Sequence, residues 1–177
     1  QEASHQPFIF ALAIASSRTP GILQTADYRL QSKLPIHERS AFQITTDTAI
    51  IMDPELGVLA KSFNTRLPAE GNPRARQLAA DILARSSSDK DFIRLLLARF
   101  STGNFIYTLK PPLLGAQAVD EFLFDTQRGF CEHYASSTAF MLRVAGIPAR
   151  VIAGYMGGEV NPITGTVLVH QFDAHAW

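Results

Sequence analysis

The chain has 177 residues, of which 46% are apolar, and this is enough for one ordinary core with a small appended subdomain. Its 16 basic and 16 acidic residues balance, so no broad electrostatic footprint for nucleic acid is visible. A single cysteine excludes an intramolecular disulfide framework and a Cys-rich zinc site. No apolar run reaches the roughly 18 to 20 residues that span a bilayer.

The first fifty residues predict strands. Residues 8–15 alternate large with mainly small side chains, and this period of two indicates a strand whose large side chains are buried: Phe8, Phe10, Leu12 and Ile14. Residues 28–33 and 41–51 also favour an extended chain, because the latter are rich in β-branched residues. We therefore predict a strand-rich N-terminal segment over residues 1–52, without a convergent set of chemical groups.

The middle of the chain favours helices. Asp53 and Pro54 form a start signal, after which Leu56, Leu59 and Phe63 share one face. Asn72 with Pro73 begins a second predicted helix over 74–85, and Ser88 begins a third that ends near Gly103. The arginines of these helices alternate with aspartates, which is typical of solvated helix faces and not of a basic binding patch.

The last third of the chain contains both helix-like and strand-like sequence patterns. Residues 104–109 read as extended and residues 119–124 as a short amphipathic turn of helix. A helix is predicted from Cys131 to a C-cap at Gly146. Strands are then expected over 149–155 and 166–172, joined by a glycine-rich loop, and the second strand leads toward His175.

Cys131 is the most informative residue of this sequence. A lone cysteine is most often a small buried hydrophobe without chemistry. This one follows Gly129 and Phe130 at the head of an apolar helix, and a helix N-terminus favours the thiolate form of a cysteine. His175 comes later, after a predicted strand. A cysteine followed by a histidine on a separate element is the order of a Cys–His nucleophile–base pair.

The other histidines carry weaker signals. His133 lies about 200° around the helix from Cys131 at 3.6 residues per turn, so we expect a surface or hydrogen-bonded role for it. His5, His37 and His170 show no metal-ligand spacing with the cysteine or with a carboxylate cluster. We expect neither a bound metal nor a cofactor.

Three ordered blocks carry a family resemblance: residues 129–137 (GFCEHYASS), 145–151 (AGIPARV, followed by Gly154 and Tyr155) and 173–177 (DAHAW). Together they resemble the core of the transglutaminase-like superfamily. Residues 109–115 (LKPPLLG) and 119–125 (VDEFLFD) are similar to its bacterial TgpA-type branch. The resemblance is strong from about residue 72 onward and weaker before it.

The resemblance implies an α+β fold, in which a helix carrying Cys131 packs on an antiparallel sheet carrying His175. This papain/transglutaminase-like core would occupy residues 53–177, truncated at its C-terminal end. Cys131 matches the family's nucleophile and His175 its base. The family's Asp lies on the strand after the histidine, and so is expected beyond Trp177. Asp173 is a poor substitute, because its carboxylate would have to curl back beside its own strand.

The implied activity is that of a protein-glutamine gamma-glutamyltransferase, an acyltransferase of EC 2.3.2 type. Cys131 would form a thioester with a glutamine side chain of a protein or peptide donor, and a Lys amine or water would resolve it. The Cys131 backbone N–H and a second donor, for which Gln127 is a candidate, would hold the oxyanion. The resemblance also implies the periplasmic domain of a bacterial inner-membrane protein, anchored outside this segment. A cysteine peptidase or amidase of the same fold, and a non-catalytic binding or scaffold module, remain as alternatives.

Overall fold

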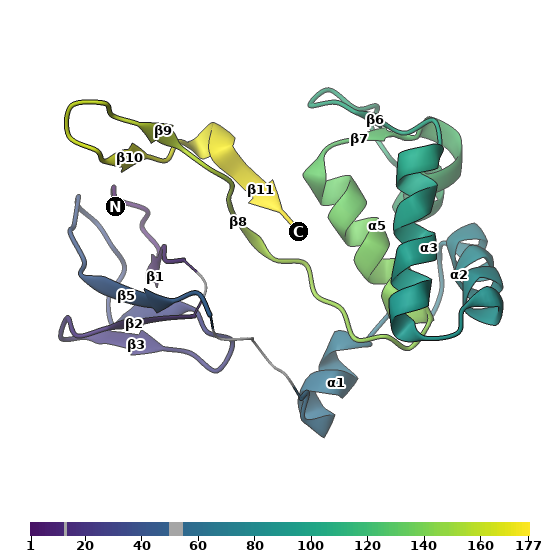
Figure 1. The fold of residues 1–177 in the computed structure, drawn as a ribbon, viewed down its shortest axis with the longest axis horizontal. Coiled ribbons are helices and arrows are strands. Elements are labelled where there is room, and N and C mark those ends of the chain that lie inside the picture. Colours follow the sequence, from purple (N-terminus) through teal and green to yellow (C-terminus); the bar gives the residue numbers. More distant parts are fainter. Residues whose placement is uncertain (13, 50–54) are drawn as a thin grey trace. The chain divides into compact units, whose positions relative to one another are not determined.

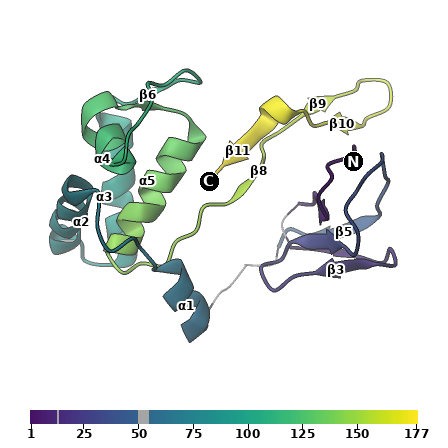
Figure 2. The same cartoon turned by 180° about the vertical axis from the view of Figure 1, so that it is seen from behind.

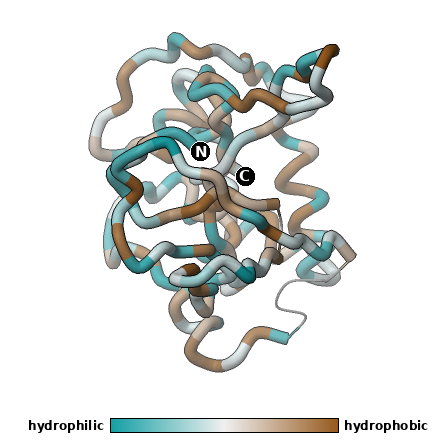
Figure 3. Tube along the Cα trace, turned by 90° about the vertical axis from the view of Figure 1, so that its left-hand side faces the viewer, coloured by the Kyte–Doolittle hydropathy of each residue, from teal (hydrophilic) through white to brown (hydrophobic). Residues whose placement is uncertain are grey.

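The computed structural model describes residues 1–12, 14–49 and 55–177. The chain divides into two compact units, residues 1–56 and 57–177 (Figure 1). Hydrophobic residues recur along the trace of both units and are not gathered in one segment (Figure 3). Each unit has its own buried cluster.

The first unit is built from short antiparallel strands: β1 (Phe8–Ile9), β2 (Ile14–Ser17), β3 (Ile22–Gln24), β4 (Leu30–Ser32) and β5 (Ile44–Asp47). Strand β4 lies between β1 and β3 in one sheet, and β2 pairs with β5 in another. Ile9, Ala15, Leu30 and Ile36 form its small core. The strand-rich character predicted from the sequence is therefore present among the described residues.

The single strand predicted over residues 8–15 is wrong. The chain forms β1 and β2 there, which pair with different partners, β4 and β5. Phe10 and Leu12, which were expected to be buried, have 55% and 74% of their surface exposed. The alternation cannot hold one face across the two strands, because the chain leaves one sheet and enters another between them. Residue 13 and the predicted strand end at 50–51 lie outside the described residues.

The second unit contains the following elements in chain order: α1 (Val58–Asn64), α2 (Pro73–Arg85), α3 (Asp89–Thr102), β6 (Ile106–Tyr107), α4 (Ala118–Asp120), the π-helix η1 (Glu121–Thr126), β7 (Arg128–Gly129), α5 (Cys131–Val144), β8 (Ala153–Tyr155), β9 (Glu159–Val160), β10 (Val167–Leu168), the 3-10 turn η2 (Gln171–Asp173) and β11 (Ala174–Ala176). The predicted α+β class is confirmed. In Figures 1 and 2, β11 ends beside α5 in both views. None of the helices that the structure describes is long and apolar enough to cross a membrane.

The core of this unit joins helices α2, α3 and α5 with η1. Their inward faces supply the fully buried side chains of the cluster, which include Phe92, Leu96, Phe122, Leu123 and Met141. The predicted helices over 74–85 and from Ser88 are confirmed, and the Ser88 hydroxyl accepts the N–H of Asp91 as an N-cap. This packing fixes α5, which carries Cys131 at its first turn.

Two predicted elements of this unit differ in extent. Helix α1 begins after Gly57, and the predicted start at Asp53 and Pro54 lies outside the described residues. Leu59 and Phe63 are four residues apart on α1, and their side chains are exposed. The strand predicted over 166–172 is too long, because β10 covers only Val167–Leu168 and the 3-10 turn η2 begins at Gln171.

Asn72 and Asp120 cap each other's helices. The Asp120 carboxylate accepts the N–H groups of Arg74 and Ala75 at 3.0 and 2.7 Å, at the start of α2. The Asn72 side-chain oxygen accepts the N–H groups of Val119 and Asp120 at 3.0 and 3.1 Å, at the start of α4. Asn72 is the N-cap residue of α2, as predicted, although its own side chain makes no capping hydrogen bond to that helix. The exchange joins α2 to the segment that leads to Cys131.

Replacing Asp120 by alanine should lower the free energy of unfolding by about 2–4 kcal/mol. The carboxylate is almost fully buried, and its loss leaves two backbone N–H groups of α2 without their acceptor. Chemical denaturation measures the change. Asp81→Ala, an exposed position in the same helix, is the control and should cost less than about 0.5 kcal/mol. Equal losses for the two variants would refute the capping role.

Candidate active site

A local distortion of the backbone leads into the cysteine. The π-helix η1 ends with the N–H of Gln127 bonded to the carbonyl of Phe122 at 3.1 Å, five residues back. Gln127 then adopts a left-handed conformation with φ of 48°. Short π-helical turns often occur at functional sites. Here the turn redirects the chain into β7, two residues before Cys131.

Strand β7 aligns this turn with β6. The two strands are parallel, with Ile106 opposite Arg128 and Tyr107 opposite Gly129. The N–H of Ile106 donates to the Gln127 carbonyl and the N–H of Thr108 to the Gly129 carbonyl, both at 2.8 Å. The pairing places Tyr107 directly beside the start of α5.

Gly129 is required here by close packing. A Cβ atom at this position would lie 2.7 Å from Cβ and Cγ of His133 and 2.8 Å from Cε2 of Phe122. Contacts this short do not occur between real carbon atoms, so the helix or the Phe122 ring would have to move. The absence of a side chain at Gly129 therefore lets the first turn of α5 pack tightly against η1.

Gly129→Ala should lower the free energy of unfolding by about 1–3 kcal/mol, because the added methyl group overpacks this junction. Thermal or chemical denaturation measures the loss. Gly57→Ala is a matched control, since a Cβ atom there meets nothing within 4 Å, and it should cost no more than about 1 kcal/mol. A Gly129→Ala protein as stable as the wild type would contradict the packing argument.

Cys131 is the first residue of α5, a free thiol that is partly exposed. Its backbone N–H has no carbonyl of the helix to bond and donates instead to the Tyr107 hydroxyl at 3.2 Å. Thiolates and other anions are stabilised at such a helix end. The predicted helix is confirmed, but its C-cap is Ala145 and not Gly146; Gly146 follows the cap with a positive φ of 77°.

His133 has a structural place in this turn. Its Nδ1 atom accepts the N–H of Phe130 at 3.4 Å, and its ring packs against those of Phe122 and Phe130. This agrees with the hydrogen-bonded role expected for it. The ring fixes the first turn of α5 from the side of the helix away from Cys131.

His175 lies on β11, which pairs with β8 so that His175 is opposite Gly154. Strand β11 contacts α5, with Cα atoms of the two elements within 8 Å of one another. The ring of His175 packs 5.0 Å from that of Trp177, measured between centroids. The fold thus brings the cysteine helix and the histidine strand together.

The Asp173 carboxylate is hydrogen-bonded within its own turn. Its carboxylate accepts the N–H of His170 at 2.7 Å and so closes the turn η2 before β11. Its backbone carbonyl accepts the N–H of Met156 at 2.8 Å. These bonds support the expectation that the orienting acid is not Asp173.

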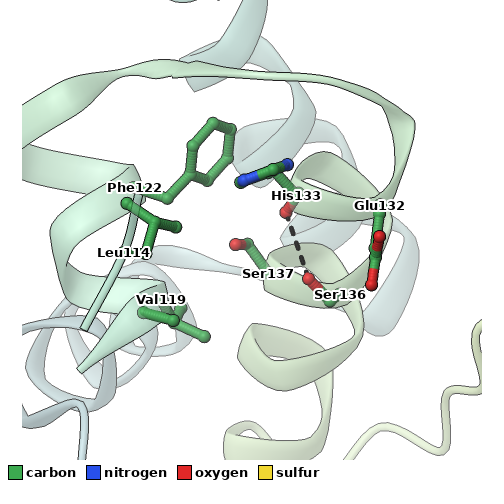
Figure 4. Close-up of a pocket in the computed structure, with 8 residues that line it drawn as sticks. Leu114, Val119, Phe122, Glu132, His133, Ser136 and Ser137 are labelled. Atoms are coloured by element: carbon green, nitrogen blue, oxygen red, sulfur yellow. Dashed lines mark hydrogen bonds between the residues drawn. The ribbon is translucent and has the colours of Figure 1, made fainter. Parts of the chain in front are cut away.

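A cavity of about 220 Å³ lies on the side of α5 that faces away from Cys131 (Figure 4). His133, Ser136 and Ser137 line it from the helix, facing Leu114, Val119 and Phe122. Cys131 is not among its lining residues, because the helical period puts it on the opposite face. Among the described residues, no group of three or more His, Cys, Asp and Glu side chains is arranged to hold a metal ion.

Sequence reasoning missed Tyr107 as a neighbour of Cys131. It was predicted only as part of an extended stretch, and that part is confirmed by β6. Gln127 was predicted as a candidate for the second oxyanion donor; the side chain that the Cys131 N–H contacts is Tyr107. The signal that could have found Tyr107 is the parallel pairing of β6 with β7, which no local pattern reveals.

Comparison with known proteins gives a consistent result. The family model of the transglutaminase-like superfamily matches residues 76–177. A protein-glutamine gamma-glutamyltransferase of Pseudomonas aeruginosa is 44% identical over 176 residues, which cover 99% of this chain and 26% of that protein. The uncharacterized protein YebA of Bacillus subtilis is 30% identical over 119 residues, which cover 63% of this chain and 16% of that protein. The chain thus spans about a quarter, or less, of the length of these relatives.

Solved structures agree with the sequence matches. The crystal structure of the periplasmic domain of TgpA from Pseudomonas aeruginosa superimposes with a TM-score of 0.95 at 44% identity, covering 99% of this chain and 61% of that one. The same domain bound to ethylmercury gives the same TM-score and covers 63% of that chain. The expected transglutaminase-like fold is confirmed.

Proposed function

The chain belongs to the transglutaminase-like superfamily, and we propose on this basis that it is part of the catalytic domain of a protein-glutamine gamma-glutamyltransferase, with Cys131 as nucleophile and His175 as base. The observation that carries the proposal is the contact between α5, which presents Cys131 at its N-terminus, and β11, which carries His175. The 44% identity to an enzyme of that name supports it.

The reaction begins with a thiolate at Cys131 and an imidazolium at His175. The sulfur attacks the side-chain amide carbon of a glutamine, an S–C bond forms, and the carbonyl electron pair moves to oxygen. When the carbonyl re-forms, the C–N bond breaks and His175 gives its proton to the departing nitrogen, which leaves as ammonia. The product is a thioester on Cys131.

A Lys amine then attacks the thioester, His175 takes the proton of that amine, and the thiolate leaves. The products are an isopeptide bond and the regenerated cysteine. The substrates are thus a protein or peptide glutamine donor and an amine acceptor. By similarity to the periplasmic domain of TgpA, this chain is assigned to the periplasm, within a membrane-anchored parent protein.

The test is transfer of a labelled primary amine to a glutamine-containing protein by the full-length parent protein. Mass spectrometry should find the amine on glutamine side chains, with one ammonia released for each amine incorporated. Glutamine converted to glutamate with added amine present, and no amine incorporated, would indicate an amidase instead. If no amide changed, the proposal would be refuted, and the non-catalytic scaffold module would be the remaining alternative.

A further inference from the structure

The hydrogen bond between the Cys131 N–H and the Tyr107 hydroxyl lies where an oxyanion would bind during acyl transfer at Cys131. In acyl transfer by a thiol, the backbone N–H of the nucleophile is an ordinary donor to the oxyanion. That oxyanion would lie 2.7–3.1 Å from the nitrogen. The Tyr107 oxygen lies 3.2 Å from it, so the phenol reaches the place where negative charge would develop.

Tyr107 is held there by the fold. Its backbone is paired in β6 against Gly129 of β7, two residues before Cys131. Its ring stacks on that of Tyr134, with centroids 6.0 Å apart and planes 22° apart. Tyr134 lies one turn along α5 from Cys131, and its burial raises its pKa, which keeps this supporting phenol neutral. Tyr107 itself is 54% exposed, so a substrate can reach this residue.

We propose that Tyr107 is a catalytic residue, the second donor of the oxyanion hole; this inference rests on the proposed acyl transfer at Cys131. In the free protein the hydroxyl oxygen accepts the Cys131 N–H. When the S–C bond forms and the carbonyl electron pair moves to oxygen, the oxyanion takes over this N–H. The phenol then turns its own O–H toward the oxyanion, and no proton leaves Tyr107.

The geometry makes this exchange a small movement. An oxyanion that accepts both donors at ordinary charge-assisted lengths requires the nitrogen and the phenol oxygen to be about 4.5 Å apart. The hydroxyl must therefore retreat by about 1.3 Å from its 3.2 Å position. The tip of an exposed tyrosine can make such a shift by small side-chain rotations, while the β6 backbone stays paired.

Two measurements on Tyr107→Phe in the full-length protein distinguish an oxyanion donor from a residue that only packs against Cys131 or blocks it. The first is the rate of Cys131 alkylation by iodoacetamide, which needs the thiolate but forms no oxyanion. The second is protection of Cys131 from that alkylation by propanal, which carries an aldehyde where a glutamine side chain carries its amide. Addition of the thiol to propanal gives a tetrahedral adduct with its oxygen in the hole, without any turnover.

We expect Tyr107→Phe to alkylate within about twofold of the wild-type rate, but to bind propanal at least about tenfold more weakly. Amine transfer should fall about 10²- to 10³-fold, with the loss in kcat. Tyr28→Phe is the matched control, since it removes a tyrosine hydroxyl from the first unit, and it should stay within about threefold in all three assays.

Several outcomes would contradict the inference, and a final one separates it from the proposed function. Unchanged propanal protection, or none even in the wild type, would mean that Tyr107 supplies no hydrogen bond to the adduct. Faster transfer and alkylation by Tyr107→Phe would show that the hydroxyl merely blocks the cysteine. Equal losses in alkylation and protection would indicate a packing role. If the wild type transfers no amine while propanal protection still depends on Tyr107, the proposed function fails and this inference stands.

Discussion

Cys131→Ala in the full-length parent protein should abolish amine transfer to glutamine, lowering kcat at least about 10⁴-fold. The sulfur forms the thioester, and alanine offers no atom that could replace it. Removal of a nucleophile commonly leaves only the catalysis that binding and an oxyanion hole provide. The alanine variant should keep the wild-type fold, because the cysteine is only partly buried and the change is small.

The control is Ser136→Ala, on the exposed side of the same helix. The Ser136 hydroxyl donates to the His133 carbonyl of its own helix at 3.4 Å, so its removal should leave the rate within about twofold. Amine incorporation and ammonia release are measured on the same samples. A Cys131→Ala protein that still released ammonia at the wild-type rate would exclude Cys131 as the nucleophile.

His175→Ala should lower amine transfer about 10²- to 10⁴-fold, the range expected for loss of a positioned acid–base group. Without the imidazole, no group activates the thiol or delivers a proton to the leaving nitrogen. His175 is partly exposed on β11, so the gap left by its side chain is open to small molecules. Added imidazole should therefore restore part of the rate, in proportion to its concentration.

His170→Ala separates this effect from a general disturbance of the region. His170 stacks on Phe172 in the turn just before β11, and its ring lies 3.9 Å from the Glu159 carboxylate. Its removal should change the rate no more than about threefold and give no response to imidazole. If imidazole restored the activity of His170→Ala, or failed to restore that of His175→Ala, the assignment of His175 as the base would be wrong.

Local patterns predicted the helices around Cys131 well. Ser88 was predicted as an N-cap, and Gly146 marked the end of the Cys131 helix to within one residue, because serine accepts a backbone N–H at a helix start and glycine adopts positive φ after a helix end. The Cys131 helix and the later His175 were identified together as a candidate pair from their order along the chain. Three separate sequence blocks then indicated the family, which the comparisons show.

Features that depend on distant partners were not predictable. The alternation of residues 8–15 suggested one strand, but β1 and β2 take partners far along the chain, and so Phe10 is exposed. The shared face of Leu59 and Phe63 on α1 is exposed, since an apolar stripe on a helix does not say whether another element covers it. Tyr107 was missed because its place beside Cys131 depends on parallel pairing with Gly129.

The central claim is that Cys131 becomes acylated by a glutamine side chain. The direct measurement is mass spectrometry of the peptide that contains Cys131, after the full-length protein meets a glutamine donor peptide without added amine and is quenched in acid. We predict that the mass of Cys131 increases by the mass of the donor peptide minus that of one ammonia. Hydroxylamine should remove this adduct, as it cleaves thioesters. An unmodified Cys131 while ammonia is released, or an adduct on another residue, would contradict it.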